Sequence, residues 1–289
     1  MLIWACSSID QRGENLMNTI LITGASSGIG KATASYFAAK GWNVIATMRA
    51  PEEETELINR ENILVVRLDV ENEKTIASAV DEGIGRFGRI DVLLNNAGYG
   101  AFGIFEAASE QQVQRQFGVN VFGVMNVTKA LLPHFRKQGA GTIINVSSML
   151  GKIGFPFFSL YAAAKWAVEG FSESLHYELS AHNIRVKIIE PGYVATDFSG
   201  RSIEVLADDR LGSAYQEQFQ AVLNKQMENL QGDLSTPTEL AEIIYEAATD
   251  NTAALRYIAG EDARFALTQR QNHSDETFMA SIAEQFQLS

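Results

Sequence analysis

The amino-acid sequence predicts an α/β protein in which a doubly wound parallel sheet is covered by helices on both faces. Three observations carry this prediction. Short runs rich in Val and Ile are apolar on both faces, as strands inside a parallel sheet are. These runs alternate along the chain with helical stretches, which is the pattern of doubly wound sheets. No internal repeat, low-complexity tract or linker divides the 289 residues.

The predicted elements follow one another in a regular order. The strands are short and cover residues 19–23, 44–47, 63–68, 92–95, 142–146, 185–189 and, more weakly, 256–259. The helices lie between them, over 29–40, 52–60, 72–87, 109–138, 159–182 and 237–249. The second helix follows Pro51 and opens with the acidic run Glu52–Glu54, both of which suit a helix N-terminus. The fourth begins Ser109-Glu-Gln-Gln112, which has the form of a capping box.

The same pattern predicts the domain organisation. The strands and helices begin only after Met17, so residues 1–16 are expected to be a disordered extension. Residues 17–260 are expected to form a single domain. Within it, residues 197–235 interrupt the alternation and are expected to be an inserted, mostly helical segment. Residues 261–289 are expected to form a polar helical tail.

The chain is acidic, with 35 Asp and Glu residues against 23 Lys and Arg residues and a net charge of −12. Residues 197–289 alone hold 16 acidic and 6 basic residues, so most of the charge lies in the inserted segment and the tail. Without a basic patch, such a chain is not expected to bind nucleic acid or an anionic membrane surface.

Other features of the sequence bear on membrane spans, disulfides and metal sites. No apolar run reaches the roughly 18 residues that a membrane helix needs, and we expect a cytoplasmic protein without a membrane span. The single cysteine, Cys6, excludes an internal disulfide. The four histidines lack metal-ligand spacing, so no metal site is expected.

A glycine-rich turn joins the first predicted strand to the first predicted helix. The segment reads Thr23-Gly24-Ala25-Ser26-Ser27-Gly28-Ile29-Gly30. Glycines in such a turn let a pyrophosphate approach backbone N–H groups, and the helix N-terminus adds its dipole. The spacing is GxxxGxG, and a turn with a purely structural role is the alternative. Because the turn follows the first strand of an alternating α/β chain, we interpret it as a dinucleotide site.

The end of the second predicted strand bears on which dinucleotide is bound. Sites for NAD usually carry an acidic residue there, where it holds the ribose 2′-hydroxyl. Here Met48 occupies the expected place and Arg49 follows. A guanidinium can pair with a 2′-phosphate, so the sequence favours NADP over NAD. The alternative is that Arg49 pairs with the acidic run Glu52–Glu54.

Tyr161 and Lys165 are candidate catalytic residues, because they lie four positions apart on a predicted helix and share a face. A nearby ammonium favours the phenolate and lowers the pKa of a tyrosine, which would prepare the hydroxyl for proton transfer to or from a carbonyl compound. A pair with this spacing is also common on ordinary helix surfaces. Ser148 favours the catalytic interpretation, because it places a hydroxyl at a strand's carboxyl end, where sites on such sheets lie.

Seven short motifs, in their order along the chain, resemble those of the short-chain dehydrogenase/reductase family. They are TGASSGIG (23–30), LDV (68–70), NNAG (95–98), VNV (119–121), NVSS (145–148), YAAAK (161–165) and PGYVAT (191–196). The resemblance is close over about residues 18–200 and continues loosely to about 260. It implies a Rossmann-like sheet of seven parallel strands and an oxidoreductase that uses a nicotinamide cofactor.

The resemblance also implies catalytic roles. Tyr161 resembles the family's general acid/base, and Lys165 resembles the residue that lowers the pKa of that tyrosine and binds the nicotinamide ribose. Ser148 stands 13 positions before Tyr161, as does the family's serine that binds the substrate carbonyl. Asn120 resembles the asparagine that holds a proton-relay water to the lysine. Helix packing is the alternative for Asn120 taken alone.

Cofactor contacts carry over in the same way. Asp69 resembles the residue at the adenine amine, with a strand-end turn as the alternative. Thr196 resembles the threonine that bonds the nicotinamide carboxamide. Asn95 is expected mainly to anchor a strand end. Ser27 stands where some NADP-preferring relatives carry a basic residue, so the preference for NADP depends on Arg49. The implied contacts are Gly24, Ser26, Ser27, Gly28, Ile29, Gly30, Arg49, Asp69, Val70, Asn95, Ala97, Gly98, Tyr161, Lys165, Pro191, Gly192, Val194 and Thr196.

Aromatic residues gather in the segments expected around the nicotinamide. They are Tyr99, Phe102, Phe105, Phe155, Phe157, Phe158, Tyr193 and Phe198. Ligand sites are mostly apolar with few polar anchors, so a small apolar ketone, aldehyde or secondary alcohol is the expected substrate. The resemblance extends this to steroids, retinoids or similar lipids. The alternative is that half of these aromatics belong to the core. Residues 198–235 are expected to form a lid over the site.

Two other functions fit the same motifs. A 3-oxoacyl-carrier-protein reductase would need a basic surface for its acidic partner, whereas acidic residues outnumber basic ones in the expected lid. A non-catalytic NADP-binding sensor or scaffold would not need the set Asn120, Ser148, Tyr161 and Lys165. The resemblance further suggests a homodimer or homotetramer built through the long helices 109–138 and 159–182.

Overall fold

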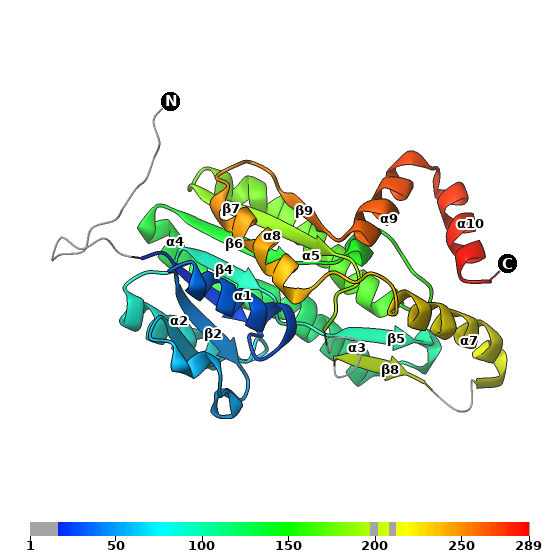
Figure 1. Cartoon of the computed structure of the whole chain (residues 1–289), viewed down its shortest axis with the longest axis horizontal. Helices are drawn as coiled ribbons and strands as arrows, with labels where there is room; N and C mark the ends of the chain where they lie inside the picture. The colour runs from blue at the N-terminus through cyan, green and yellow to red at the C-terminus, as the bar shows by residue number, and fades with distance from the viewer. Residues whose placement is uncertain (1–16, 197–201, 208–211, 289) are drawn as a thin grey trace.

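A computed structural model describes residues 17–196, 202–207 and 212–288, so the expectations for residues 1–16 and for Phe198 lie outside the described residues. Seven parallel strands form the central sheet (Figure 1), as predicted. In sheet order they are β3 (Ile63–Arg67), β2 (Asn43–Met48), β1 (Thr19–Thr23), β4 (Val92–Asn95), β6 (Gly141–Val146), β7 (Ile184–Pro191) and β9 (Arg256–Ala259).

The sheet is doubly wound about β1. The chain passes outward from β1 to β2 and β3, then returns to β4 on the other side of β1 and continues outward to β6, β7 and β9. Strand order therefore reverses between β1 and β4. In such sheets ligands bind outside the carboxyl ends of the strands at this reversal, which is where the glycine turn and Asn95 lie.

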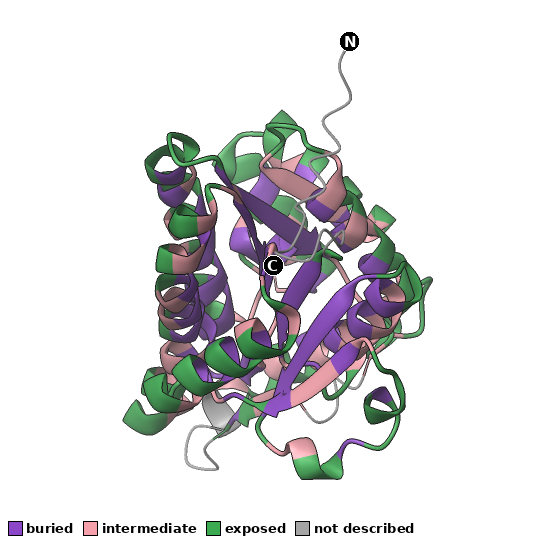
Figure 2. Ribbon diagram, turned by 90° about the vertical axis from the view of Figure 1, so that its left-hand side faces the viewer, coloured by how far each residue is buried: buried purple, intermediate pink, exposed green. Residues whose placement is uncertain are grey.

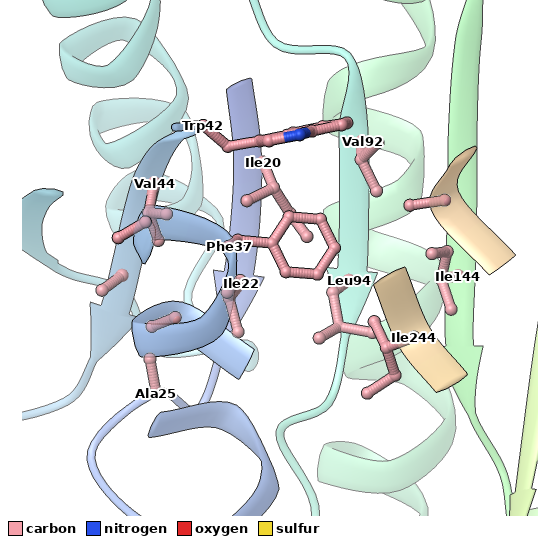
Figure 3. Close-up of a cluster of buried hydrophobic side chains, with 14 of the residues drawn as sticks. Ile20, Ile22, Ala25, Phe37, Trp42, Val44, Val92, Leu94, Ile144 and Ile244 are labelled. Atoms are coloured by element: carbon pink, nitrogen blue, oxygen red, sulfur yellow. The ribbon is translucent and has the colours of Figure 1, made fainter. Parts of the chain in front are cut away.

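Helices cover both faces of the sheet (Figure 2), and alternate residues of each strand face opposite layers. On β1, Ile20 and Ile22 pack in one cluster with Phe37 and Ile244 (Figure 3), while Leu21 belongs to the cluster on the other face. The first layer is formed by α1 (Gly28–Ala39) and α8 (Pro237–Thr249), and the second by α2 (Glu73–Phe87), α4 (Gly123–Gln138) and α5 (Ser159–Ser180).

The predicted helix over 52–60 is wrong. The structure has two short 3-10 turns there, Pro51–Glu53 and Leu57–Asn59. The Glu54 carboxylate accepts hydrogen bonds from the backbone N–H groups of Glu56 at 2.8 Å and Leu57 at 3.0 Å. An α-helix would use these two N–H groups for its own hydrogen bonds, so the side chain diverts the backbone.

The predicted helix over 109–138 is interrupted. It begins as α3 (Glu110–Phe117), with the expected capping box at Ser109, and resumes as α4 after a wider π-type turn, Gly118–Phe122. Such turns inside helices often occur at functional sites, and this one contains Asn120.

The inserted segment and tail contain one element that the sequence did not predict. The strand β8 (Ile203–Leu206) pairs in parallel with β5 (Gly100–Gly103) in a separate two-stranded sheet. The remaining helices are α7 (Gly212–Asn229), α9 (Glu261–Asn272) and α10 (Asp275–Gln285). Figure 1 shows these elements together at one end of the molecule. Within the described residues, no helix combines the length and apolarity needed to cross a membrane.

Candidate active site

The glycine turn closes tightly against the start of α1. Gly24 has a φ of 69°, a conformation that favours glycine, and a Cβ on Gly30 would lie 2.3 Å from the Gly24 carbonyl oxygen. Ser27 is the N-cap of α1, but its side chain makes no capping hydrogen bond. The first N–H groups of the helix therefore have no side-chain cap, and they can serve an anionic ligand.

Asn96 holds this turn in place, and sequence reasoning missed it. Its Nδ2 donates to the carbonyl oxygens of Thr23 at 2.9 Å and Gly24 at 3.0 Å, while its backbone N–H donates to Thr23 Oγ1 at 3.0 Å. The side chain thus ties the end of β4 to the turn after β1. Its position in NNAG directly after a predicted strand was the available signal.

The segment after β7 returns to the same turn. A Cβ on Gly28 would lie 3.4 Å from Thr196 Cγ2, which places Thr196 beside the N-terminus of α1. Val194 pairs with Ser235, and the Gly192 N–H donates to the carbonyl of Ala259 at 2.9 Å. The predicted motif 191–196 is therefore brought against the glycine turn, although about 165 residues separate the two in sequence.

Arg49 lies exposed at the carboxyl end of β2 and makes no hydrogen bond or ion pair with the described residues. The acidic run does not hold it, because Glu52 pairs with Arg67 at 3.0 Å and Glu54 pairs with Lys31 at 3.3 Å. The alternative interpretation of Arg49 as a partner of that run is therefore wrong, and its guanidinium is available to a ligand.

Asp69 and Val70 follow β3. Asp69 Oδ1 accepts from the Glu71 N–H at 3.1 Å, so Asp69 forms the strand-end turn that was the alternative to a cofactor contact. It remains half-buried, and the two functions are compatible. Val70 is buried in the core beneath it.

The candidate catalytic side chains converge at the end of β6. Tyr161 and Lys165 lie on buried positions of α5, and the hydroxyl groups of Tyr161 and Ser148 are hydrogen-bonded. Lys165 Nζ donates to the carbonyl oxygen of Val146 at 2.8 Å and lies 5.6 Å from the centre of the Tyr161 ring. Ser148, rather than Ser147, thus reaches the tyrosine.

The electrostatics of this group correct one expectation. Burial raises the pKa of Tyr161 to about 12, while its hydrogen bond to Ser148 acts in the opposite direction. Burial also lowers the pKa of Lys165 to about 8, against the attraction of the Glu169 carboxylate. The expected lowering of the tyrosine pKa is therefore not seen in the protein alone, because the loss of hydration outweighs the hydrogen bond from Ser148. At neutral pH both groups are protonated.

Asn120 is fully engaged by the backbone of Tyr99. Its Oδ1 accepts from the Tyr99 N–H at 3.1 Å, and its Nδ2 donates to the Tyr99 carbonyl at 2.7 Å. The side chain therefore positions the segment that follows β4, next to Gly98. The relay role that the resemblance implies for Asn120 stays a prediction.

Asn95 anchors neighbouring strands, as expected. Its Nδ2 donates to Asn145 Oδ1 at 2.8 Å and to Thr128 Oγ1 at 3.0 Å, and Asn145 continues the network to Ser172 at 2.8 Å. All four side chains are buried. This network links β4, β6, α4 and α5 behind the candidate site, whereas Ala97 and Gly98 remain partly exposed.

Most of the candidate pocket aromatics pack against one another. Phe102 lies 4.9 Å from Phe158 and 5.4 Å from Phe219 of α7, measured between ring centres. Phe155 lies 5.4 Å from Phe286, a fully buried residue directly after α10. Phe105 is the exception among these rings because it is exposed. The inserted segment and tail therefore share an apolar cluster with the segments that flank Tyr161.

Comparison with known proteins places this geometry in a family. The family model described as short chain dehydrogenase matches residues 18–207. An uncharacterized oxidoreductase of Schizosaccharomyces pombe is 41% identical over 244 residues, which are 83% of this chain and all of that protein. A 3-ketodihydrosphingosine reductase of Bacteroides thetaiotaomicron is 46% identical over 180 residues, 62% of this chain and 65% of that one.

Solved structures agree in fold. A short-chain dehydrogenase from Streptomyces avermitilis has a TM-score of 0.80 and 33% identity, and the match covers 93% of this chain and 95% of that one. A 3-ketoacyl-(acyl-carrier-protein) reductase from Brucella melitensis, complexed with NADH, has a TM-score of 0.70 and 27% identity over 84% of this chain and 97% of that one. With the strand order, glycine turn and Ser148–Tyr161–Lys165 group, these matches establish that the chain is an oxidoreductase of the short-chain dehydrogenase family.

Proposed function

We propose that the protein is an NADP(H)-dependent oxidoreductase that moves a hydride between the nicotinamide and the carbonyl or secondary alcohol carbon of a small apolar substrate. The observation that carries this proposal is the buried group at the end of β6. There the Tyr161 hydroxyl bonds Ser148, and Lys165 lies beside the tyrosine ring.

The residues present fit a dinucleotide. The turn at Gly24 and Gly30 leaves no room for side chains, and the uncapped start of α1 offers N–H groups to a pyrophosphate. Thr196 stands beside Gly28 at the same helix end, and this supports the contact with the nicotinamide amide that the family resemblance implies. When bound, the nicotinamide supplies or accepts the hydride.

The chain's own residues handle the proton. Because the pKa of Tyr161 is about 12, the hydroxyl is protonated at neutral pH and can donate its proton to a carbonyl oxygen. Ser148 donates a second hydrogen bond to that oxygen and stabilises its developing charge. The Lys165 ammonium stabilises the tyrosinate left behind. The protonated Tyr161 hydroxyl is therefore suited to the reduction of a carbonyl compound.

Arg49 supports the choice of NADP. It is a guanidinium without a partner among the described residues, at the strand end where NAD sites carry an acid, and Met48 beside it is buried. A 2′-phosphate would give this arginine a charge-assisted partner.

The cluster around Tyr161 supports an apolar substrate. Tyr161 packs with Met149, Leu150 and Leu267, and the tail residue Phe278 joins the same cluster. We infer that the inserted segment and the helices α9 and α10 cover the site together. Tyr193 links α7 to α9, because its hydroxyl donates to Gln226 Oε1 of α7 at 2.6 Å and its backbone N–H donates to Asp262 Oδ2 of α9 at 2.7 Å. The similarity to a 3-ketodihydrosphingosine reductase supports a ketone with a long apolar chain.

A 3-oxoacyl-carrier-protein reductase is the second enzymatic candidate, supported by the solved structure of such a reductase. The charge of this cover opposes it. Its described basic side chains already lie beside acidic ones: Lys225 is 3.1 Å from Glu228, Arg264 is 3.5 Å from Glu261, and Arg270 is 2.6 Å from Asp275. The neighbouring Glu217 and Asp233 are acidic. An acidic carrier protein would meet repulsion there.

We also propose a homo-oligomer that uses α4 and α5. Three large apolar side chains are exposed on this part of the molecule, namely Phe122, Trp166 and Tyr177. Apolar surface exposed on neighbouring helices is typical of subunit contacts. Analytical sedimentation of the protein measures the assembly, and a monomer at all concentrations contradicts it.

The function is tested with a panel of aromatic and lipid-like carbonyl compounds, each with NADPH and with NADH. Tyr161→Phe is expected to lower kcat by about 10²–10⁴-fold, because the phenyl ring has no proton to give. Its affinity for NADPH is expected to remain near that of the wild type. A Tyr161→Phe variant that keeps most of its activity contradicts the mechanism. Tight NADPH binding without turnover of any compound would favour a sensor.

A further inference from the structure

Two buried carboxylates lie directly behind the catalytic group and play no part in the mechanism above. Glu169 is one helical turn after Lys165 on α5, and Glu190 is the residue before Pro191 at the end of β7. Their exposed fractions are 5% and 2%. Burying a carboxylate destabilises the folded state unless nearby charges or hydrogen bonds compensate it. The groups around these two carboxylates therefore decide whether both are ionised.

One guanidinium, that of Arg256, lies close to both carboxylates. Arg256 Nε donates to Glu169 Oε2 at 3.0 Å and lies 3.3 Å from Glu190 Oε1 without forming a second hydrogen bond. Its Nη2 donates at 2.6 Å to the exposed Glu173. Three carboxylates therefore converge on one arginine, and the two buried ones lack enough positive charge for both to be ionised at low cost.

Buried polar atoms beside these carboxylates also lack hydrogen-bond partners. Oε1 of Glu169, Oε1 of Glu190 and Oγ of Ser147 are buried and have no hydrogen-bond partner among the described residues. Ser147 and Glu169 face the same spot, because a Cβ on Gly151 would lie 2.5 Å from Ser147 Oγ and 3.2 Å from Glu169 Oε1. A proton on one carboxyl group would supply the missing donor.

The charges that face Glu190 come from three elements. They are Glu169 on α5, which repels its anion, and Arg256 on β9 and Lys152 after β6, which attract it. Burial and then Glu169 raise the pKa of Glu190 to about 7, despite the two cations. In the single subunit, a surface hollow is lined by Glu169 and Arg256 but not by Glu190.

We propose that the buried carboxyl group of Glu190 holds a proton, and that the carboxylate charge of Glu169 keeps Lys165 protonated. Glu169 acts as a positioning residue, because it stabilises the Lys165 ammonium without contacting substrate or cofactor. As the pH rises and the proton leaves Glu190, negative charge is added beside Glu169, and this charge opposes the loss of the proton from Lys165. This inference rests on the proposed function only for the catalytic role of Lys165.

The first test needs neither cofactor nor turnover. Infrared difference spectra of the cofactor-free protein, titrated between acid and alkaline pH, should show the carbonyl stretch of a protonated carboxylic acid that disappears near neutral pH. Glu190→Gln should lose this band, whereas Glu173→Gln should keep it. If no band titrates near neutral pH, or if Glu190→Gln retains it, the proton on Glu190 is refuted even where the proposed function stands.

The second test is the pH profile of kcat. Removing the Glu169 charge should lower the pKa of Lys165 and move the alkaline limb about one pH unit lower, the size expected for a close opposite charge. Glu169→Gln provides this change, Glu169→Asp should restore the limb, and Glu173→Gln should leave it unchanged. If the alkaline limb falls at the same pH in Glu169→Gln and Glu173→Gln, the coupling between Glu169 and Lys165 is refuted. If Glu169→Gln does not fold, Glu190→Gln should still show a smaller shift in the same direction, and its absence would likewise contradict the proposal.

Discussion

The assignment of Arg49 to a 2′-phosphate leads to a sharp prediction for Arg49→Ala. The side chain is exposed at the end of β2 and has no partner among the described residues, so its removal breaks no internal hydrogen bond or ion pair there. The fold should therefore be unaffected, within about 0.5 kcal/mol of unfolding free energy, as for ordinary surface substitutions. Any loss of cofactor binding then reports on the ligand contact itself.

The size of that loss follows from the exposure of the side chain. A hydrogen bond to a charged group contributes about 1.5–3 kcal/mol, but exposed ion pairs contribute about 0.2–1 kcal/mol because water screens them. We expect an intermediate value of about 1–2 kcal/mol, which corresponds to about a 5- to 30-fold weaker binding of NADPH. NADH has no 2′-phosphate, so its affinity should change by less than about twofold.

The assay is direct titration of the free enzyme with each cofactor, because a Michaelis constant equals a dissociation constant only when chemistry is slow. Arg67→Ala is the matched control. Arg67 is the β3 residue in register with Met48, but its guanidinium already pairs with Glu52 at 3.0 Å. It should leave both affinities near those of the wild type. Equal losses for NADPH and NADH in Arg49→Ala would show that the arginine has a structural role, and a wild-type preference for NADH would refute the assignment outright.

Three further substitutions probe other parts of the molecule. Asn96→Ala removes two hydrogen bonds to the glycine turn, so binding of NADPH and NADH, followed by calorimetry, should weaken equally by about 1–3 kcal/mol; a selective loss would contradict this. Asp250→Asn leaves the buried ammonium of Lys187 without its carboxylate and should lower the free energy of unfolding, measured with urea, by about 3 kcal/mol. The pKa of Asp250 is lowered to about 2, so in the wild type this stability is present at neutral pH and is lost as the pH falls from about 4 towards 2. Phe286→Ala should lower the free energy of unfolding by about 3–5 kcal/mol. It should also raise the KM of the substrate but not that of NADPH. Unchanged substrate kinetics would show that the tail does not cover the site.

The strands could be predicted because their signal is local. Each core strand is a short apolar run, and a parallel sheet with helices on both faces requires such runs. The helix predicted at 52–60 does not form, for an equally local reason that the residue types alone do not reveal. A single carboxylate, Glu54, takes the backbone N–H groups of Glu56 and Leu57. The strand β5 was missed because it contains two glycines and finds its partner, β8, about 100 residues later.

The candidate site was predictable to the extent that it lies at strand ends. Parallel strands bring their carboxyl ends to one edge, so Ser148 and the glycine turn had to be neighbours once the sheet was known. Asn96 was not predicted, because only the folded turn shows which of two adjacent asparagines faces it. The expected lowering of the Tyr161 pKa was also not found, since spacing on a helix says nothing about burial.

The sequence by itself determined the alternation of strands and helices, the family and the candidate reactive side chains, because these depend on residue type and short spacing. Only the tertiary structure decided how those side chains are charged and what covers them. The tail aromatics meet the site through packing, and Arg256 meets Glu169 across 87 positions of the chain. Burial and long-range contact set pKa values and close cavities, and both arise only when distant segments are brought together.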